Sequence, residues 1–178
     1  MRFWRPESIH YVALLVVIIL FLVIHEGTHV IAARLVGTPL TYKIHVYGVE
    51  KRFTTPMYEG VKLALISGLS SIVTILLGYI GFVQRRRLAK LRNRFIGVCG
   101  FWFIICFMTL DPLNLSVGGL IYEGDALGIA IGLGINRHLV EATYFTIFII
   151  NMTLIMRKLL PTYKWRSDVH VKLKIYQF

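Results

Sequence analysis

The sequence has few acidic residues, few prolines and almost no cysteine. Its 178 residues include nine Asp or Glu against 20 Lys or Arg, together with five prolines and two cysteines. Cys99 and Cys106 lie seven residues apart in one apolar segment, where they are typical of small packing residues rather than of a disulfide or a metal site. No internal repeat or low-complexity tract is found, which excludes repeat architectures.

The net charge of +11 is strongly basic, a property shared by many nucleic-acid-binding proteins. The sequence contains no basic helical face interleaved with aromatic residues, so we expect no nucleic acid partner. In an apolar chain, the simpler explanation is that Lys and Arg crowd the loops beside anionic lipid headgroups.

Long apolar runs dominate the rest of the chain. Hydrophobic residues make up 56% of the sequence and the mean hydropathy is +0.67, which is too apolar for an ordinary soluble domain. The apolar segments cover residues 11–33, 61–83, 95–110 and 139–156, and a shorter helix is expected over 124–135. We predict an all-α polytopic membrane protein, integral to the lipid bilayer, with about five transmembrane or partly spanning helices in a single domain of residues 1–178.

The first apolar segment could be mistaken for a secretory signal, because Arg2 and Arg5 precede it. It is too long for a signal and has no small-residue cleavage site before Arg34, so we expect it to remain as a span.

Residues 36–60 differ from the apolar segments because glycine and proline interrupt short alternating runs. Residues 41–47 alternate like a strand, and a second strand could cover 51–55. We predict a small membrane-associated β-hairpin after the first helix, with an ordinary connecting loop as an equal alternative. The edge of such a hairpin could pair with an extended substrate.

Two further segments are expected to lack regular helix. Pro112 should end the helix before it, and the glycines and polar residues of 111–123 predict irregular backbone, which a membrane tolerates only inside protein or a wet cavity. Residues 162–178 are predicted to form a polar C-terminal tail.

Two histidines four residues apart, His25 and His29, lie with Glu26 inside the first apolar segment. Residues four apart share one face of a helix, so both imidazoles can bind one metal ion. Glu26 follows His25 directly, where its carboxylate can take a proton from a water at the metal. Three ionisable groups within five residues are costly in lipid, which favours a metal site over histidines that merely pack in a core.

A catalytic zinc ion with two histidine ligands needs a third protein ligand and an open position for water. Counting spans places residues 111–125 on the same membrane side as the histidines, so Asp111, Glu123 and Asp125 are candidates. Asp125 has the most favourable context because it follows Gly124 at the start of a helix. Any of these acids that is not a ligand could instead orient a ligating imidazole.

These residues resemble the site-2 protease family of intramembrane zinc metalloproteases. Residues 25–29 match the family's zinc-binding helix, and residues 66–71 are similar to its Gly-Pro-x-x-Asn/Ser stretch on the following span. Residues 113–115 and then 123–126 resemble its Asn-Leu-x-Pro loop and its Leu-Asp-Gly motif, whose Asp is the third zinc ligand. The resemblance covers roughly residues 23–135 and implies a minimal core without a PDZ or CBS module.

The predicted function is therefore that of an intramembrane zinc endopeptidase, which cleaves transmembrane or membrane-associated proteins in regulated intramembrane proteolysis. One Zn²⁺ per chain would be held by His25, His29 and Asp125, with Glu26 as the general base.

Three residues are predicted to contact the transmembrane protein substrate. Gly68 and Ser71 belong to a stripe of small residues that would let the substrate helix, or a neighbouring helix, approach closely. Asn114 would either hydrogen-bond the unwound substrate or cap its own loop.

Two other functions and the membrane orientation stay open at this point. A catalytically silent scaffold of the same fold would not need Glu26, and a metal-ion carrier would need a second ionisable cluster on the far side, which the sequence lacks. Nine of the 20 Lys and Arg residues fall on one expected side, so charge does not decide which side faces the cytoplasm.

Overall fold

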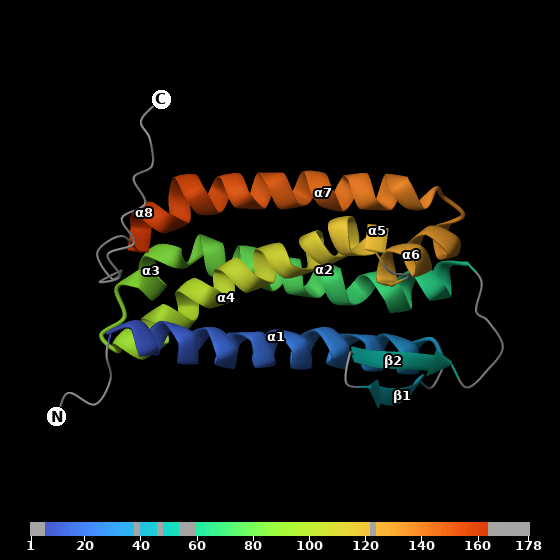
Figure 1. Cartoon of the computed structure of the whole chain (residues 1–178), viewed down its shortest axis with the longest axis horizontal. Coiled ribbons are helices and arrows are strands. Elements are labelled where there is room, and N and C mark those ends of the chain that lie inside the picture. Colours follow the sequence, from blue (N-terminus) through green and yellow to red (C-terminus); the bar gives the residue numbers. More distant parts are fainter. Residues whose placement is uncertain (1–5, 38–39, 46–47, 54–59, 122–123, 164–178) are drawn as a thin grey trace.

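Four long helices run along the molecule in the computed structural model of this chain (Figure 1). They are α1 (Pro6–Leu35), α2 (Val61–Val83), α4 (Arg94–Leu113) and α7 (Arg137–Leu154). Shorter helices connect or extend them: α3 (Arg85–Ala89), α5 (Gly119–Ile121), α6 (Asp125–Leu133), α8 (Leu160–Tyr163) and two π-helical turns, η1 (Asn114–Gly118) and η2 (Ile155–Leu159). The structure describes residues 6–37, 40–45, 48–53, 60–121 and 124–163.

Within these ranges, four helical stretches are long and apolar enough to cross a membrane: Ser8–Leu35, Val61–Val83, Arg94–Ile121 and Arg137–Tyr163. The predicted all-α architecture is found, but the count differs from the expected five or so transmembrane or partly spanning helices. The nine residues of α6 extend only about 14 Å, whereas a hydrocarbon layer is about 30 Å thick. Large apolar side chains such as Leu15 and Ile72 are exposed on the long helices, as expected of surfaces that face lipid.

Two short strands follow α1 within residues 36–60. β1 (Leu40–His45) and β2 (Gly48–Phe53) pair antiparallel, with Leu40 opposite Phe53 and His45 opposite Gly48. Figure 1 shows them beside the end of α1 at which α6 also lies.

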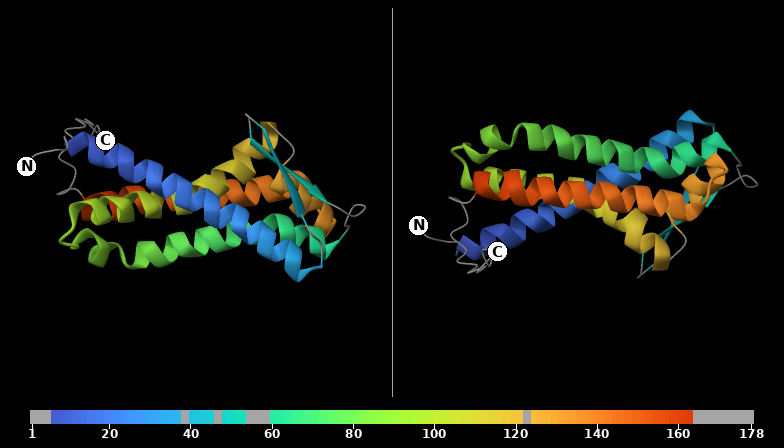
Figure 2. Two further views of the ribbon diagram at one scale, coloured as in Figure 1. Left: turned by 90° about the horizontal axis from the view of Figure 1, so that it is seen from below. Right: turned by 90° about the horizontal axis from the view of Figure 1, so that it is seen from above.

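The long helices form three layers, with α2 and α4 between α1 and α7 (Figure 1). Figure 2 shows α1 crossing the other helices obliquely. Apolar side chains fill the space between α1 and α4, where Phe21 meets Phe107 edge-on with ring centroids 5.4 Å apart. Cys106 belongs to this cluster and, like Cys99, is a free thiol, in agreement with the predicted packing role.

Helix α4 continues past Pro112, contrary to the prediction that this proline would end it. Proline has no amide hydrogen, so the carbonyl four residues earlier, that of Met108, loses its helical donor. Asn151 of α7 replaces it, because its Nδ2 donates to the Met108 carbonyl at 2.6 Å while its Oδ1 accepts from the Tyr79 hydroxyl at 2.6 Å. Because the Met108 carbonyl is hydrogen-bonded to Asn151, the helix can continue. Residues 111–121 are therefore helical, as the end of α4, η1 and α5, and not irregular as predicted.

Candidate metal centre

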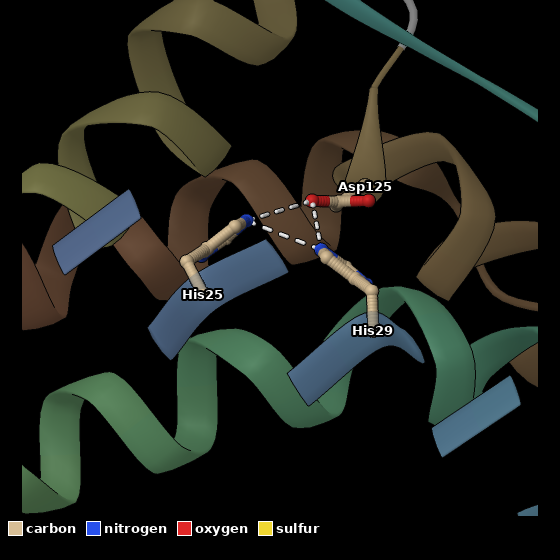
Figure 3. Close-up of side chains that lie close together, drawn as sticks. All are labelled: His25, His29 and Asp125. Carbon is tan, nitrogen blue, oxygen red and sulfur yellow. Dashed lines mark hydrogen bonds and ion pairs between the residues drawn. The ribbon is translucent and has the colours of Figure 1, made fainter. Parts of the chain in front are cut away.

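Helix α1 presents His25 and His29 on one face, one turn apart (Figure 3). Both imidazoles are buried, with 6% of His25 and none of His29 exposed. Glu26 is half-buried at the next position after His25. Burying two imidazoles in an apolar helix is favourable only if their nitrogens find partners.

Asp125 reaches the histidines as the first residue of α6. Helix α6 lies close against α2 because two of its inward residues are glycines. A Cβ atom at Gly132 would come within 3.0 Å of the backbone nitrogen of Ala64, and one at Gly128 would come within 3.0 Å of the Ser67 side chain. These glycines therefore allow the close helix contact that positions Asp125.

Three side-chain atoms converge in Figure 3. The Nε2 atoms of His25 and His29 are 3.1 Å apart, and they lie 3.6 and 3.3 Å from the Oδ2 atom of Asp125. Around a tetrahedral zinc ion with ligand distances of about 2.0–2.2 Å, neighbouring ligand atoms are roughly 3.3–3.6 Å apart. The observed triangle therefore has the dimensions of one face of a zinc coordination tetrahedron.

The other nitrogen of each imidazole faces a group that can only accept a hydrogen bond. The Nδ1 atom of His29 donates to the Ile66 carbonyl at 2.6 Å, and that of His25 lies 3.0 and 3.2 Å from the two carboxylate oxygens of Asp111. With hydrogens on both Nδ1 atoms, the neutral imidazoles direct their Nε2 lone pairs toward each other and toward Asp125. Such facing lone pairs repel unless a cation lies between them, so the residues fit a metal ion.

Asp111 belongs to the site, but it lies on the Nδ1 side of His25 and not among the three converging ligand atoms. Only 1% of it is exposed, and its Oδ2 accepts a hydrogen bond from the hydroxyl of Thr74 on α2. It is thus placed to orient His25, the alternative role predicted for an acid that is not a ligand. The third candidate acid, Glu123, lies outside the described residues.

Replacing Asp111 by asparagine is expected to lower zinc affinity about 10–100-fold, because the amide can present its NH₂ group to Nδ1 and favour the wrong tautomer of His25. Competition with a chromophoric zinc chelator measures this change. Glu141→Gln is the matched control, since Glu141 is also a buried acid but pairs with Arg137 and His138 at the start of α7. Equal affinities for the two variants would exclude an orienting role for Asp111.

The residues predicted to bind substrate lie around the centre rather than in it. A Cβ at Gly68 would be 3.3 Å from Ile129, so Gly68 serves the approach of a neighbouring helix of the same chain, α6. Ser71 is fully buried, and its carbonyl oxygen lies 3.0 Å from the hydroxyl oxygen of Thr74. Asn114 is half-buried and begins η1, a regular part of the helical backbone rather than an irregular loop.

Three parts of the site were missed from the sequence. The Ile66 carbonyl has no sequence signal at all, because every residue carries one. Thr74 follows Ser71 by three residues in an apolar span, and this spacing could have indicated that both hydroxyls share one face. Tyr144 of α7 lines the groove between α2, α6 and α7, but one aromatic residue in an apolar segment is not distinctive.

An apolar groove lies between α2, α6 and α7. It has a volume of about 220 Å³ and is lined by residues of α2, α6 and α7: Val61, Ala64, Leu65, Gly68, Leu69, Ile72, Ile129, Leu133 and Tyr144. Ile129 follows Asp125 by one helical turn, which places part of this lining one turn away from the converging ligand atoms.

Two imidazole nitrogens and one carboxylate oxygen form a donor set typical of catalytic zinc, which keeps its fourth position for water or substrate. Among the residues that the structure describes, His25, His29 and Asp125 are the group of metal-binding side chains whose ligand atoms converge, within 4.8 Å of one another. Comparisons with models of known protein families, with curated protein sequences and with solved structures find no match to this chain.

Proposed function

We propose that this protein is a zinc-dependent endopeptidase that works within a membrane as a multi-pass protein. The observation that carries the proposal is the convergence of three ligand atoms from His25, His29 and Asp125, with both Nδ1 atoms turned away onto acceptors. The four long apolar helices support the placement in a membrane, since their exposed apolar surfaces suit lipid better than water.

His25, His29 and Asp125 would hold one zinc ion per chain. When bound, zinc polarises a carbonyl group and makes a coordinated water acidic enough to lose its proton near neutral pH. Glu26 would accept that proton and donate it to the leaving amine, as a general base and then a general acid. Asp111 keeps the hydrogen of His25 on Nδ1 and so leaves Nε2 free to act as a ligand.

We infer that the substrate is an apolar segment of a transmembrane or membrane-associated protein. The groove between α2, α6 and α7 is apolar and begins one turn from Asp125, so it suits aliphatic side chains beside the bond to be cleaved. We also infer that β1 and β2 form a membrane-associated hairpin, whose free edge would pair with substrate that has been unwound into an extended strand.

Zinc removal tests the proposal directly. The purified protein in proteoliposomes is expected to contain one zinc ion per chain and to cleave a single-span substrate; a chelator should abolish cleavage and added zinc should restore it. Asp125→Asn should lose bound zinc, because a neutral amide is a much weaker ligand than a carboxylate. Elemental analysis and gel analysis of the substrate give the two readouts.

Two outcomes would contradict the proposal. Cleavage by zinc-free protein would show that the metal has no catalytic role. A protein that binds zinc through these three residues but cleaves no membrane substrate would favour the catalytically silent scaffold.

A further inference from the structure

The end of the molecule opposite α6 is strongly basic. Helix α3 and the segment that joins it to α4 lie there, beside η2 and α8 (Figure 1). Six basic side chains are exposed on these elements: Arg86, Arg87, Lys90, Arg92, Arg157 and Lys158. We call this surface the basic end.

Packing of α3 directs these charges outward. On one side, Leu88 and Ala89 pack into an apolar cluster with Tyr163 of α8. Arg85 turns back onto the protein, since its guanidinium lies 4.5 Å from the centre of the Phe82 ring and donates to the Phe82 carbonyl at 3.0 Å. The opposite side of α3 carries the exposed Arg86 and Arg87, which are thus held on a rigid element.

Residues 84–94 and 155–163, which carry the six exposed basic side chains, include no Asp or Glu. The other end differs. There Arg137 pairs with Glu141 at 2.7 Å, and of the side chains that the structure describes at that end, two basic ones, Arg34 and Lys62, are exposed.

Apolar side chains border the basic end. Val83 at the end of α2 is 76% exposed, and Phe95 and Ile96 at the start of α4 are 38% and 51% exposed. Exposed cations directly beside exposed apolar side chains are the pattern of a membrane interface, where headgroups meet hydrocarbon. A folded nucleic acid or an acidic soluble protein would leave these apolar residues in water, so lipid is the favoured partner.

The four-span topology also changes the charge count between the two sides. Because α7 crosses from the α6 end to the basic end, Arg137 flanks the metal-centre side while Arg157 and Lys158 flank the other. The positive-inside rule counts Lys and Arg by their place in the sequence relative to the spans. On that count, fourteen of the 20 Lys and Arg residues belong to the side of the basic end. Two of them precede α1 in the sequence, six lie in residues 84–94 and six follow α7. The other six Lys and Arg residues belong to the side of the metal centre. A further crossing by residues 124–135 would instead put Arg137 and the residues after α7 on the opposite sides, which is why the sequence alone predicted a nearly even division.

We propose that the basic end binds the phosphate groups of anionic phospholipids at the cytoplasmic leaflet, so that the metal centre lies in the half of the membrane farther from the cytoplasm. Guanidinium groups bind phosphate through paired hydrogen bonds, and each added charge strengthens attachment to an anionic leaflet. The proposal rests on the membrane placement in the proposed function but not on zinc binding or proteolysis, so either can fail alone.

Cysteine labelling tests the orientation. In a Cys99→Ala/Cys106→Ala background, single cysteines at Lys90 and at Arg34 report the two ends with an impermeant maleimide. We expect Lys90→Cys to be labelled in spheroplasts only after permeabilisation, and Arg34→Cys to be labelled without it. The reverse pattern, or labelling of both positions from one side, would overturn the proposed orientation.

Lipid retention tests the partner. Protein purified from mixed phosphatidylglycerol and phosphatidylcholine bilayers is examined by native mass spectrometry. Arg86→Gln/Arg87→Gln should weaken retention of phosphatidylglycerol about fivefold for each charge removed. The conservative Arg86→Lys/Arg87→Lys variant and the opposite-end Arg34→Gln/Lys62→Gln variant should retain it. Equal retention of the two lipids by the unmodified protein, or equal losses at both ends, would overturn lipid binding by the basic end.

Discussion

Replacing Glu26 by glutamine is expected to abolish cleavage while leaving one zinc ion bound per chain. Glutamine has nearly the same shape as glutamate but cannot accept a proton. Glu26 is not one of the three residues whose ligand atoms converge, so its replacement should leave zinc binding intact. Loss of a general base typically slows a reaction about 10²–10⁴-fold. Single-turnover cleavage of a membrane-inserted substrate measures the rate, and elemental analysis of the same sample measures zinc.

A neighbouring residue supplies the control for Glu26. Thr28 lies on the same turn of α1, is half-buried, and donates its hydroxyl hydrogen to the Ile24 carbonyl at 2.7 Å. Thr28→Val should therefore retain both zinc and activity. If Glu26→Gln cleaves as fast as the unmodified protein, another group is the base; if it loses zinc, Glu26 supports the centre rather than the reaction.

The second large effect is expected from a methyl group placed 7 residues beyond Asp125, at Gly132. A Cβ there would meet the backbone nitrogen of Ala64 and the carbonyl oxygen of Gly60, which cannot rotate away as a side chain could. In Gly132→Ala, α6 must therefore move away from α2 and carry Asp125 with it. Displacing a catalytic group by about 1 Å can cost about 10²-fold in rate, so we expect both zinc affinity and cleavage to fall.

Gly27→Ala is the matched control for Gly132→Ala. Gly27 lies inside the His-Glu-x-x-His segment, yet a Cβ there would meet no atom within 4 Å. Alanine favours helix by about 1 kcal/mol over glycine, so this variant should be at least as stable as the unmodified protein and fully active. Zinc binding and thermal unfolding in detergent compare the two variants. An active, zinc-replete Gly132→Ala protein would show that the close contact between α6 and α2 does not position Asp125.

Much of the candidate site could be predicted from the sequence because its signals are local. The spacing of His25 and His29 matches one helical turn, and Glu26 is their immediate neighbour, so the geometry of a single helix brings these groups together. The lengths of the apolar runs likewise predicted the long helices, because crossing a bilayer requires about 20 apolar residues whatever surrounds them.

The course of the chain after Asp111 could not be predicted in the same way. Pro112 predicted a break, yet α4 continues because Asn151, 43 residues after Met108, donates to the carbonyl that the proline leaves without a partner. The short helix α6 was expected over residues 124–135, close to its observed bounds, but apolar composition did not show that its nine residues extend only about 14 Å and pack against α2.

The sequence by itself determined two imidazoles, an adjacent carboxylate and a choice among three acids. Only the tertiary structure assigned different places to two of those acids, with Asp125 toward the Nε2 atoms and Asp111 at the Nδ1 atom of His25. The physical reason is that a carboxylate's role depends on which nitrogen it faces. That depends on how α4 and α6 pack against α1 and α2, through contacts between residues far apart in the chain.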